Sequence, residues 1–390
     1  MDDLKKKSLS NHEKFKGKFA THSKIKITSI DDLSWAYSPG VSAPCEAIAK
    51  DCSLAYRYTS KGNTVGVITD GSAVLGMGNI GPDAALPVME GKAILFKELA
   101  GVDAIPLCID EKNTDAFIET CIRLAPSFGG INLEDIAAPK CFEIERRLIE
   151  ALDIPVFHDD QHGTAIVTAA ALINGARYLK RDLSSLDVLL IGTGAAGNAI
   201  AKMLNHLGVH AIQAFNIDGP IHPQNTKMDS ATRSLLDEEI IRPASTIDDT
   251  LKTLIRNKDV VIGVSTGDLL DANMIRSMRP NPMVFALANP TPEINPEIAK
   301  EAGAAIVGTG RSDYPNQINN VLAFPGFFRG LLDNRVHLVT EDMKLIAAKA
   351  IAATIDDDAL DADYIVPSPL DKRVVPSISR AISDHIKTSR

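Results

Sequence analysis

One stretch, VLLIGTGAAGNAIAKMLNHLG at residues 188–208, constrains the fold of this chain more than any other. An apolar run of strand type leads directly into the pattern G-x-G-x-x-G, and the apolar spacing that follows is helical. The first glycine of such a pattern makes the tight turn, the second lets a pyrophosphate approach the backbone, and the third lets helix and strand pack closely. Phosphates then lie on the helix N-terminus, where free N–H groups favour anions. The stretch predicts a dinucleotide fold, with the cofactor at Gly192, Gly194, Ala195, Ala196 and Gly197.

The rest of the chain predicts an α/β protein in two halves. In the second half, short apolar runs predict strands at 188–192, 211–216, 260–264, 284–288 and 305–308. Helical segments alternate with them, which indicates βαβ units and a Rossmann-like, doubly wound parallel sheet. The first half is mixed α/β, with strands expected at 65–70, 104–110 and 154–159 and helices at 87–101 and 138–153.

A long helix at 163–181 is expected to bridge the two halves. We therefore expect one domain at 1–162 and a second at 163–390. Two further helices, at 341–355 and 375–389, follow the last parallel strand, and we expect them to pack back against the first domain.

A second G-x-G-x-x-G, GMGNIG at 76–81, is weaker. Pro82 follows it at once and Pro87 comes soon after, and these prolines spoil a nest of free N–H groups. We interpret this match as a loop on the substrate side.

The sequence favours NAD⁺ over NADP⁺ as coenzyme. A ribose-binding acid is expected about 20 residues past the glycines. That position is Asn216, with Asp218 two residues later, and no arginine stands beside it for the 2′-phosphate of NADP⁺. Asp218 remains able to reach a ribose 2′-hydroxyl.

Charge and composition exclude several classes of partner. The chain of 390 residues has a formal charge of -9, which disfavours nucleic acid or an anionic membrane as the main partner. The exception is the N-terminus, where eight lysines between Lys5 and Lys26 predict a basic, solvated segment or a subunit contact. No apolar run approaches membrane-span length, and the N-terminus lacks the features of a secretory signal. The five cysteines contain no C-x-x-C and predict reduced, mostly buried thiols in a cytoplasmic protein.

The stretch FHDDQHGT at 157–164 raises the question of a metal site. Zinc would need a third His or Cys nearby, and no other His lies within 40 residues on either side of His158 and His162. Carboxylates are the stronger signal, because acidic pairs end two strand-like segments and such ends meet at one crevice. The pairs are Glu134 with Asp135 and Asp159 with Asp160. They predict a hard oxygen site for Mg²⁺ or Mn²⁺.

At this point the chain resembles the malic enzymes of the short bacterial type. The resemblance runs from about residue 30 to the last helix. The matching stretches are WAYSPGVSAPC (35–45), VITDGSAVLGMGNIGP (67–82), PVMEGKAILFKELAGVDA (87–104), FGGINLEDI (128–136), IPVFHDDQHGTAIV (154–167), GTGAAG (192–197), FALANPTPE (285–293), NNVLAFPG (319–326) and YIVPSPLDKRVVP (364–376).

The resemblance implies oxidative decarboxylation of L-malate to pyruvate, with NAD(P)⁺ reduced and a divalent metal required, in a first domain for substrate and metal and a second for NAD(P). It implies Glu134, Asp135 and Asp160 as metal ligands. It also implies a general acid, a general base and a carboxylate that tunes the base, which are Tyr37, Lys92 and Asp159 respectively. The substrate would meet Asn289 and Asn320, with Asn319 beside them, and Asn289 also lies where the nicotinamide is expected.

Elementary chemistry supports the acid and the base. Hydride loss from C2 is easier once the C2 hydroxyl loses its proton, and a lysine serves as base only if its pKa falls towards neutrality. Lys92 lies in an otherwise apolar helical segment, which suits that need. The enol left after CO₂ departs needs a proton at C3, and Tyr37 is a plausible donor.

Two departures from the family pattern leave alternatives open. Larger malic enzymes have an arginine after DGS that grips a malate carboxylate, whereas this chain has Ala73 there. The grip is therefore unassigned, and asparagines, backbone amides or a second subunit are candidates. The weak ribose signal at Asn216 leaves room for a metal-dependent oxaloacetate decarboxylase on the same fold. A non-catalytic sensor on this fold would have no physical need for all six of the acid, base and metal residues, which argues against that class of function. We also expect the chain to form at least a homodimer.

Overall fold

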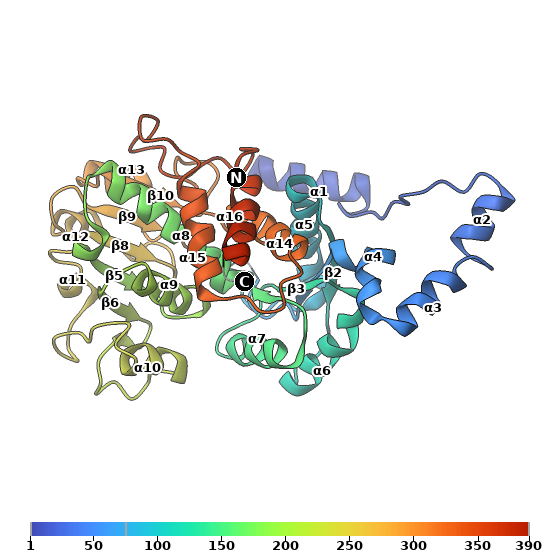
Figure 1. The fold of residues 1–390 in the computed structure, drawn as a ribbon. Coiled ribbons are helices and arrows are strands. Elements are labelled where there is room, and N and C mark those ends of the chain that lie inside the picture. Colours follow the sequence, from blue (N-terminus) through green and yellow to red (C-terminus); the bar gives the residue numbers. More distant parts are fainter. Residues whose placement is uncertain (1, 75, 389–390) are drawn as a thin grey trace.

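The body of the protein is built on two sheets, one wholly and one largely parallel, each covered by helices on both faces (Figure 1). The structure is a computed structural model that describes residues 2–74 and 76–388. The predicted α/β class is confirmed. Among the described residues, no helix is both long and apolar enough to cross a membrane.

The first sheet has the strand order β2-β1-β3-β4 and is wholly parallel. Its strands are β1 (Thr64–Thr69), β2 (Asp103–Cys108), β3 (Gly130–Leu133) and β4 (Val156–His158). Alternate residues of β1 point to opposite faces, as the strand period requires. Val65 and Val67 join the core beneath helix α5 (Pro82–Ala100), whereas Ile68 joins the core beneath α6 (Thr114–Leu124) and α7 (Lys140–Ala151).

The second sheet has the strand order β10-β9-β8-β5-β6-β7, with only the edge strand β7 antiparallel. Its strands are β5 (Asp187–Ile191), β6 (Ala211–Asn216), β7 (Gly219–Pro220), β8 (Val260–Gly263), β9 (Met283–Ala286) and β10 (Ile306–Thr309). The helices between them are α9 (Ala195–His206), α10 (Ser230–Asp237), α11 (Leu251–Leu254), α12 (Ala272–Arg276) and α13 (Pro296–Glu301). The order reverses at β5, so the glycine-rich loop lies at the switch point where parallel sheets bind ligands.

Helix α8 (Asp159–Tyr178) joins the two sheets and is buried along most of its length. It begins four residues before the predicted start at 163, because Asp159 and Asp160 form its first turn instead of ending a strand. Acidic residues are favoured in a first helical turn. The boundary between residues 162 and 163 thus falls inside a helix, and the division at that point stays a prediction.

Three helices close the chain: α14 (Phe324–Asp333), α15 (Glu341–Ala352) and α16 (Val374–Thr388). Helix α14 packs against the first domain. The ring centroid of its Phe324 lies 4.7 Å from that of Phe96 on α5. Helix α16 packs on α14 and α15, and α15 packs on α8. Ser389, the last residue expected in the final helix, lies outside the described residues.

The N-terminal segment leaves the body of the protein. Its helices are α1 (Asp2–Phe15), α2 (Ile30–Ala36), α3 (Ser42–Lys50) and α4 (Ala55–Tyr58). Residues 20–50, which we call the arm, carry α2 and α3 away from both sheets, to the right in Figure 1. Neither of those two helices has a buried residue. Short 3-10 helices complete the fold at Cys52–Leu54, Ser60–Asn63, Ala125–Ser127, Leu183–Ser185 and Asn320–Leu322.

Candidate active site

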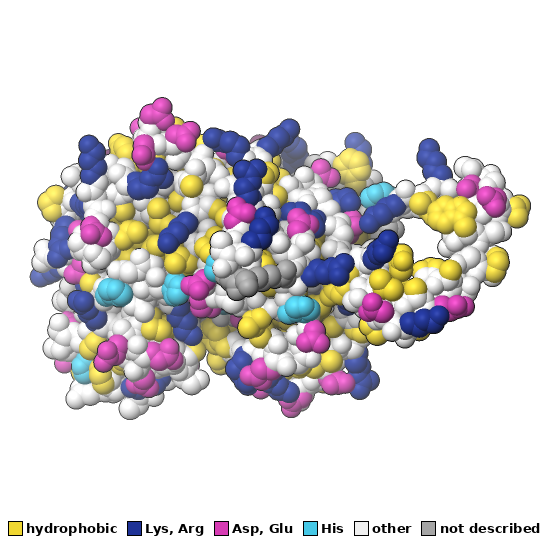
Figure 2. Space-filling model, in the orientation of Figure 1, with side chains coloured by type: hydrophobic (Ala, Val, Ile, Leu, Met, Phe, Trp, Pro, Cys, Tyr) yellow, Lys and Arg dark blue, Asp and Glu magenta, His cyan; other side chains and the backbone are white. Residues whose placement is uncertain are grey.

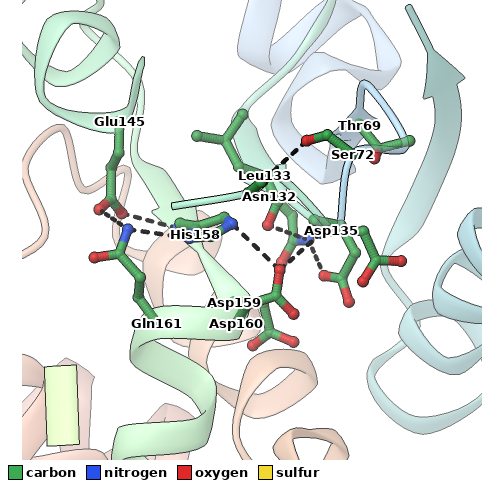
Figure 3. Close-up of polar contacts among 12 residues, drawn as sticks. Thr69, Ser72, Asn132, Leu133, Asp135, Glu145, His158, Asp159, Asp160 and Gln161 are labelled. Atoms are coloured by element: carbon green, nitrogen blue, oxygen red, sulfur yellow. Dashed lines mark hydrogen bonds and ion pairs between the residues drawn. The ribbon is translucent and has the colours of Figure 1, made fainter. Parts of the chain in front are cut away.

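The predicted acidic pairs meet at the carboxyl edge of the first sheet. Glu134 and Asp135 follow β3, and Asp160 lies in the first turn of α8 after β4. Carboxylate oxygens of these three residues lie within 4.8 Å of one another. The backbone N–H of Asp135 donates to Oδ2 of Asp160 at 2.7 Å, a contact visible in Figure 3. The strand ends therefore bring together the three acids predicted to bind a metal.

Lys92 enters this cluster from α5 and is 5% exposed. Its Nζ lies 2.9 Å from Oε1 of Glu134, forms an ion pair with Asp159, and stands 4.1 Å from the ring centroid of Phe324. Burial lowers the pKa of Lys92, but Asp159 and Glu134 outweigh burial, so that this pKa lies above its ordinary value. The expectation of a lowered lysine pKa is therefore wrong for the protein alone, because two carboxylates stabilise the ammonium form.

Negative charge exceeds positive charge around Lys92. Burial raises the pKa of Glu134 well above its ordinary value, with Lys92 opposing and the neighbouring aspartates reinforcing the rise. The pKa of Asp160 is lowered in spite of burial, because His158 stabilises its charged form. Burying several carboxylates so close together costs free energy unless a cation is bound among them.

The donor set suits a hard divalent cation better than zinc. Carboxylate oxygens are the ligands that Mg²⁺ and Mn²⁺ prefer. His158 Nε2 lies 3.2 Å from Oδ2 of Asp160, so this histidine contacts a candidate ligand, and His162 turns instead to Glu145. Glu134, Asp135 and Asp160 are the residues that would hold the cation.

A buried network behind His158 escaped the sequence analysis. Glu145 on α7 accepts hydrogen bonds from the His158 backbone N–H at 2.8 Å and from the Gln161 side chain at 3.0 Å, and it lies 2.9 Å from His162 Nε2. Lys344 on α15 places its Nζ 3.0 Å from the other ring nitrogen of His162. Figure 3 shows His158 between Glu145 with Gln161 on one side and Asp160 on the other. The network fixes the first turn of α8, which carries Asp160.

One sequence signal would have revealed Glu145. The buried face of α7 consists of Cys141, Ile144, Glu145 and Leu148, at the helical spacing of an apolar stripe. A glutamate inside such a stripe needs buried partners.

Glu145 predicts a loss of stability in acid. Burial raises its pKa, but His162 and Lys344 outweigh burial and lower it from 4.5 to about 2. Because the folded pKa is the lower one, the stabilisation is present above pH 4.5 and is lost as the pH falls towards 2, in total about 3 kcal/mol. We expect urea unfolding at pH 7 and at about pH 3.5 to show a larger drop in unfolding free energy for the wild type than for Glu145→Gln, with roughly half of the total lost by then. Equal drops in the two proteins would contradict the assignment.

The glycine-rich loop has the geometry that its sequence predicted. Gly192 has a φ of 99°, and a Cβ there would lie 2.8 Å from the carbonyl oxygen of Val264. A Cβ on Gly197 would lie 2.0 Å from the carbonyl oxygen of Gly192, whereas nothing lies within 4 Å of one on Gly194. Helix α9 starts directly after, at Ala195 and Ala196, and Ala195 packs against the core of the first domain. The loop thus leaves an open approach to a helix N-terminus beside the first domain.

The two candidate ribose residues take different roles. Asn216 donates from its side chain to Thr193 Oγ1 at 2.9 Å and accepts from the backbone N–H of Asp218 at 2.9 Å. Asn216 thereby braces the loop and the turn after β6. The Asp218 residue is exposed at the end of that strand, where a ribose is expected.

The candidate substrate asparagines lie at the carboxyl edge of the second sheet. Asn289 follows β9, and a Cβ on Gly76 would lie 2.3 Å from its carbonyl oxygen, so the loop 76–81 packs against it. Asn320 approaches α8, because its Cβ lies 3.1 Å from the position of a Cβ on Gly163. The side chain of Asn319 accepts from the backbone N–H of Val321 at 3.0 Å and so caps a short helix.

The structure does not bring Tyr37 to this cluster. Tyr37 lies between α2 and α3 on the arm and is 70% exposed. The arm carries four more exposed apolar side chains, Ile30, Leu33, Trp35 and Val41. Hydrophobic side chains are visible along the arm in the space-filling view (Figure 2).

The cysteines differ in part from expectation. All five are free, as predicted, but only Cys121 and Cys141 are buried. Cys45 and Cys52 are exposed because they lie on or beside the arm, which has no core of its own.

Comparison with known proteins identifies relatives along almost the whole chain. The family model described as malic enzyme, N-terminal domain, matches residues 16–149, and that described as malic enzyme, NAD binding domain, matches residues 161–387. A bifunctional malic/malolactic enzyme of Bacillus subtilis is 50% identical over 386 residues, which cover 97% of this chain and 92% of the relative. An NADP-dependent malic enzyme of Halomonas elongata is 44% identical over 98% of this chain and 94% of the relative. The crystal structure of an NAD-dependent malic enzyme from Thermotoga maritima superposes with a TM-score of 0.92 at 44% identity, covering 96% of this chain and 98% of that one.

Proposed function

The chain belongs to the malic enzyme family, and we propose that it catalyses the oxidative decarboxylation of L-malate to pyruvate and CO₂ with a divalent cation, Mg²⁺ or Mn²⁺, and NAD⁺ as electron acceptor. One observation carries the proposal. A buried lysine, Lys92, contacts Glu134 beside Asp135 and Asp160, and the glycine-rich loop lies next to the same domain. The proposed base and cation site thus lie in the domain against which the proposed coenzyme loop packs.

Lys92 is the proposed base. It takes the proton of the C2 hydroxyl, and Asp159 orients its ammonium group through their ion pair. NAD⁺ held at the glycine-rich loop would supply the acceptor for the C2 hydride. A divalent cation at Glu134, Asp135 and Asp160 would lower the pKa of Lys92 by engaging Glu134 and repelling the ammonium, and it would stabilise the oxygen charge left as CO₂ departs. Asn289 and Asn320 are proposed to orient the substrate, with Asn319 holding the turn that carries Asn320.

Tyr37 is the proposed acid that protonates C3, and we assign it to the site of a partner subunit in a homodimer. Within one chain Tyr37 is exposed on the arm, whose helices α2 and α3 stand apart from α5, the helix that carries Lys92 (Figure 1). The exposed apolar residues of the arm join no core among the described residues of their own chain, and burying them would stabilise an assembly. A second copy of the chain supplies both the surface for the arm and the site for the tyrosine.

NAD⁺ is the proposed coenzyme because Asp218 offers an exposed carboxylate at the end of β6. A carboxylate there accepts hydrogen bonds from a ribose 2′-hydroxyl and repels a 2′-phosphate. The formal net charge of -9 disfavours a nucleic-acid partner. The free cysteines fit the reducing cytoplasm.

The cation site predicts a specific loss of metal binding. We expect Asp160→Asn to weaken Mn²⁺ binding by more than about tenfold, because a charged ligand becomes a neutral one. Calorimetric titration of Mn²⁺ measures this without any turnover. Asp248→Asn, at an exposed position, is the matched control and should bind Mn²⁺ as the wild type does. Unchanged Mn²⁺ affinity in Asp160→Asn would remove this residue from the site.

A second activity deserves a test because the Bacillus subtilis relative is named a bifunctional malic/malolactic enzyme. Conversion of malate to lactate needs no net oxidant, since the NADH formed in the first step is consumed when pyruvate is reduced. We propose that the same site performs this step when pyruvate and NADH both remain bound. Lactate formed from L-malate and NAD⁺ would establish it.

A further inference from the structure

We propose that Arg311 binds the substrate carboxylate that remains in the product, an assignment that rests on the proposed function. Malate carries two carboxylates, and a buried anion needs a positively charged or hydrogen-bonding partner. Ala73 offers a methyl group, and its backbone N–H already donates to the carbonyl oxygen of Asp135 at 2.9 Å. Lys92 is engaged by Glu134 and Asp159, and Lys140 is paired with Asp70.

Arg311 stands directly after β10, at the same sheet edge as Asn289. Its Nη1 donates to the carbonyl oxygen of Pro290 at 2.8 Å, and its backbone N–H donates to Thr309 Oγ1 at 3.2 Å. A Cβ on Gly310 would lie 2.6 Å from Nδ2 of Asn289, so the loop after β10 packs on the asparagine itself. The guanidinium is thereby fixed beside a proposed substrate residue.

The guanidinium keeps donors for a ligand. It has five N–H groups, of which Nε and Nη2 each donate one to Asp313 and Nη1 donates one to Pro290. Among the described residues no other acceptor is bonded to Nη1 or Nη2, so each terminal nitrogen keeps one N–H that can donate to a carboxylate. The Asp313 side chain is 56% exposed, so water screens its charge. The ion pair therefore fixes the position of the arginine and leaves its positive charge available to a ligand.

The chemistry of the reaction selects between the two carboxylates. The C4 carboxylate leaves as neutral CO₂, so a strong cation on it would stabilise a charge that must disappear. The C1 carboxylate keeps its charge from malate to pyruvate. Binding at C1 thus orients the substrate without opposing decarboxylation.

Oxalate is the probe, because it keeps the C1 carboxylate and the neighbouring oxygen but lacks C4. Its binding to the full-length protein with Mn²⁺ is measured by calorimetry for the wild type, Arg311→Gln and Asp313→Asn. We expect Arg311→Gln to weaken oxalate binding about 10- to 100-fold and to raise the KM for malate in proportion, with NAD⁺ binding unchanged. Asp313→Asn leaves the arginine charged and keeps one side-chain oxygen that accepts a hydrogen bond from it, so it should weaken oxalate binding by no more than about threefold.

Two results would overturn the assignment. Oxalate affinity in Arg311→Gln within twofold of the wild type would show that the guanidinium does not touch the carboxylate. Equal weakening in Arg311→Gln and Asp313→Asn would show that the ion pair only shapes the loop. Oxalate binding needs no turnover, so it can be measured even if the protein does not oxidise malate. A wild-type protein that binds oxalate but does not oxidise malate would contradict the proposed function, and the comparison of oxalate affinities would still test the role of Arg311.

Discussion

Replacing Lys92 by arginine is expected to lower kcat about 10²- to 10⁴-fold while NAD⁺ and Mn²⁺ still bind. Arginine keeps a positive charge for Glu134 and Asp159 but cannot give up its proton at neutral pH. Lys92→Met is expected to lose the same activity and also to unfold more easily, because it leaves buried carboxylates without their cation. Steady-state kinetics and urea unfolding of both variants separate loss of the base from loss of the fold.

A neighbouring lysine supplies the control for this test. Lys97 lies on the same helix and pairs with Asp103, but its side chain is 41% exposed. Lys97→Met should keep wild-type turnover. If Lys92→Arg turned malate over within a factor of about three of the wild type, Lys92 would not be the base.

Mixing two inactive variants is expected to restore activity if Tyr37 works in the partner's site. Tyr37→Phe lacks the acid, and Lys92→Arg lacks the base. A mixed dimer of the two holds one site with both groups, because the intact arm of one chain meets the intact body of the other. Random pairing from equal amounts makes about half of the dimers mixed, each with one working site of two, so that roughly a quarter of wild-type activity should return.

A second mixture shows that any recovery comes from the arm. Lys92→Arg and Asp160→Asn both alter the body of the chain, so no dimer of these two holds an intact site. Co-expression and purification of each mixture, followed by malate kinetics, makes the comparison. No recovery in the Tyr37→Phe mixture, with dimers present by sedimentation, would mean that the arm serves its own chain.

The strands and the acidic cluster were predictable because local rules decide them. Apolar runs such as 188–192 lie within one or two residues of the strands observed. The meeting of Glu134 and Asp135 with Asp160 followed from the rule that parallel strands end at one edge of a sheet.

The rest depended on contacts that no local pattern encodes. His162 meets Lys344 across 182 positions of the chain, and the partners of Glu145 lie on β4 and α8. The raised pKa of Lys92 needed the positions of both carboxylates, and these came only with the fold. The place of Tyr37 depends on the arm, whose exposed apolar residues find no core within one chain.

The most direct test of the central claim is an assay of the purified protein with L-malate, Mn²⁺ and NAD⁺ that follows NADH and pyruvate together. The account predicts equal amounts of both products, no reaction after chelation of the metal, and a slower reaction with NADP⁺. Neither product with either coenzyme, together with metal-dependent loss of CO₂ from added oxaloacetate, would contradict it and would identify the protein as an oxaloacetate decarboxylase instead.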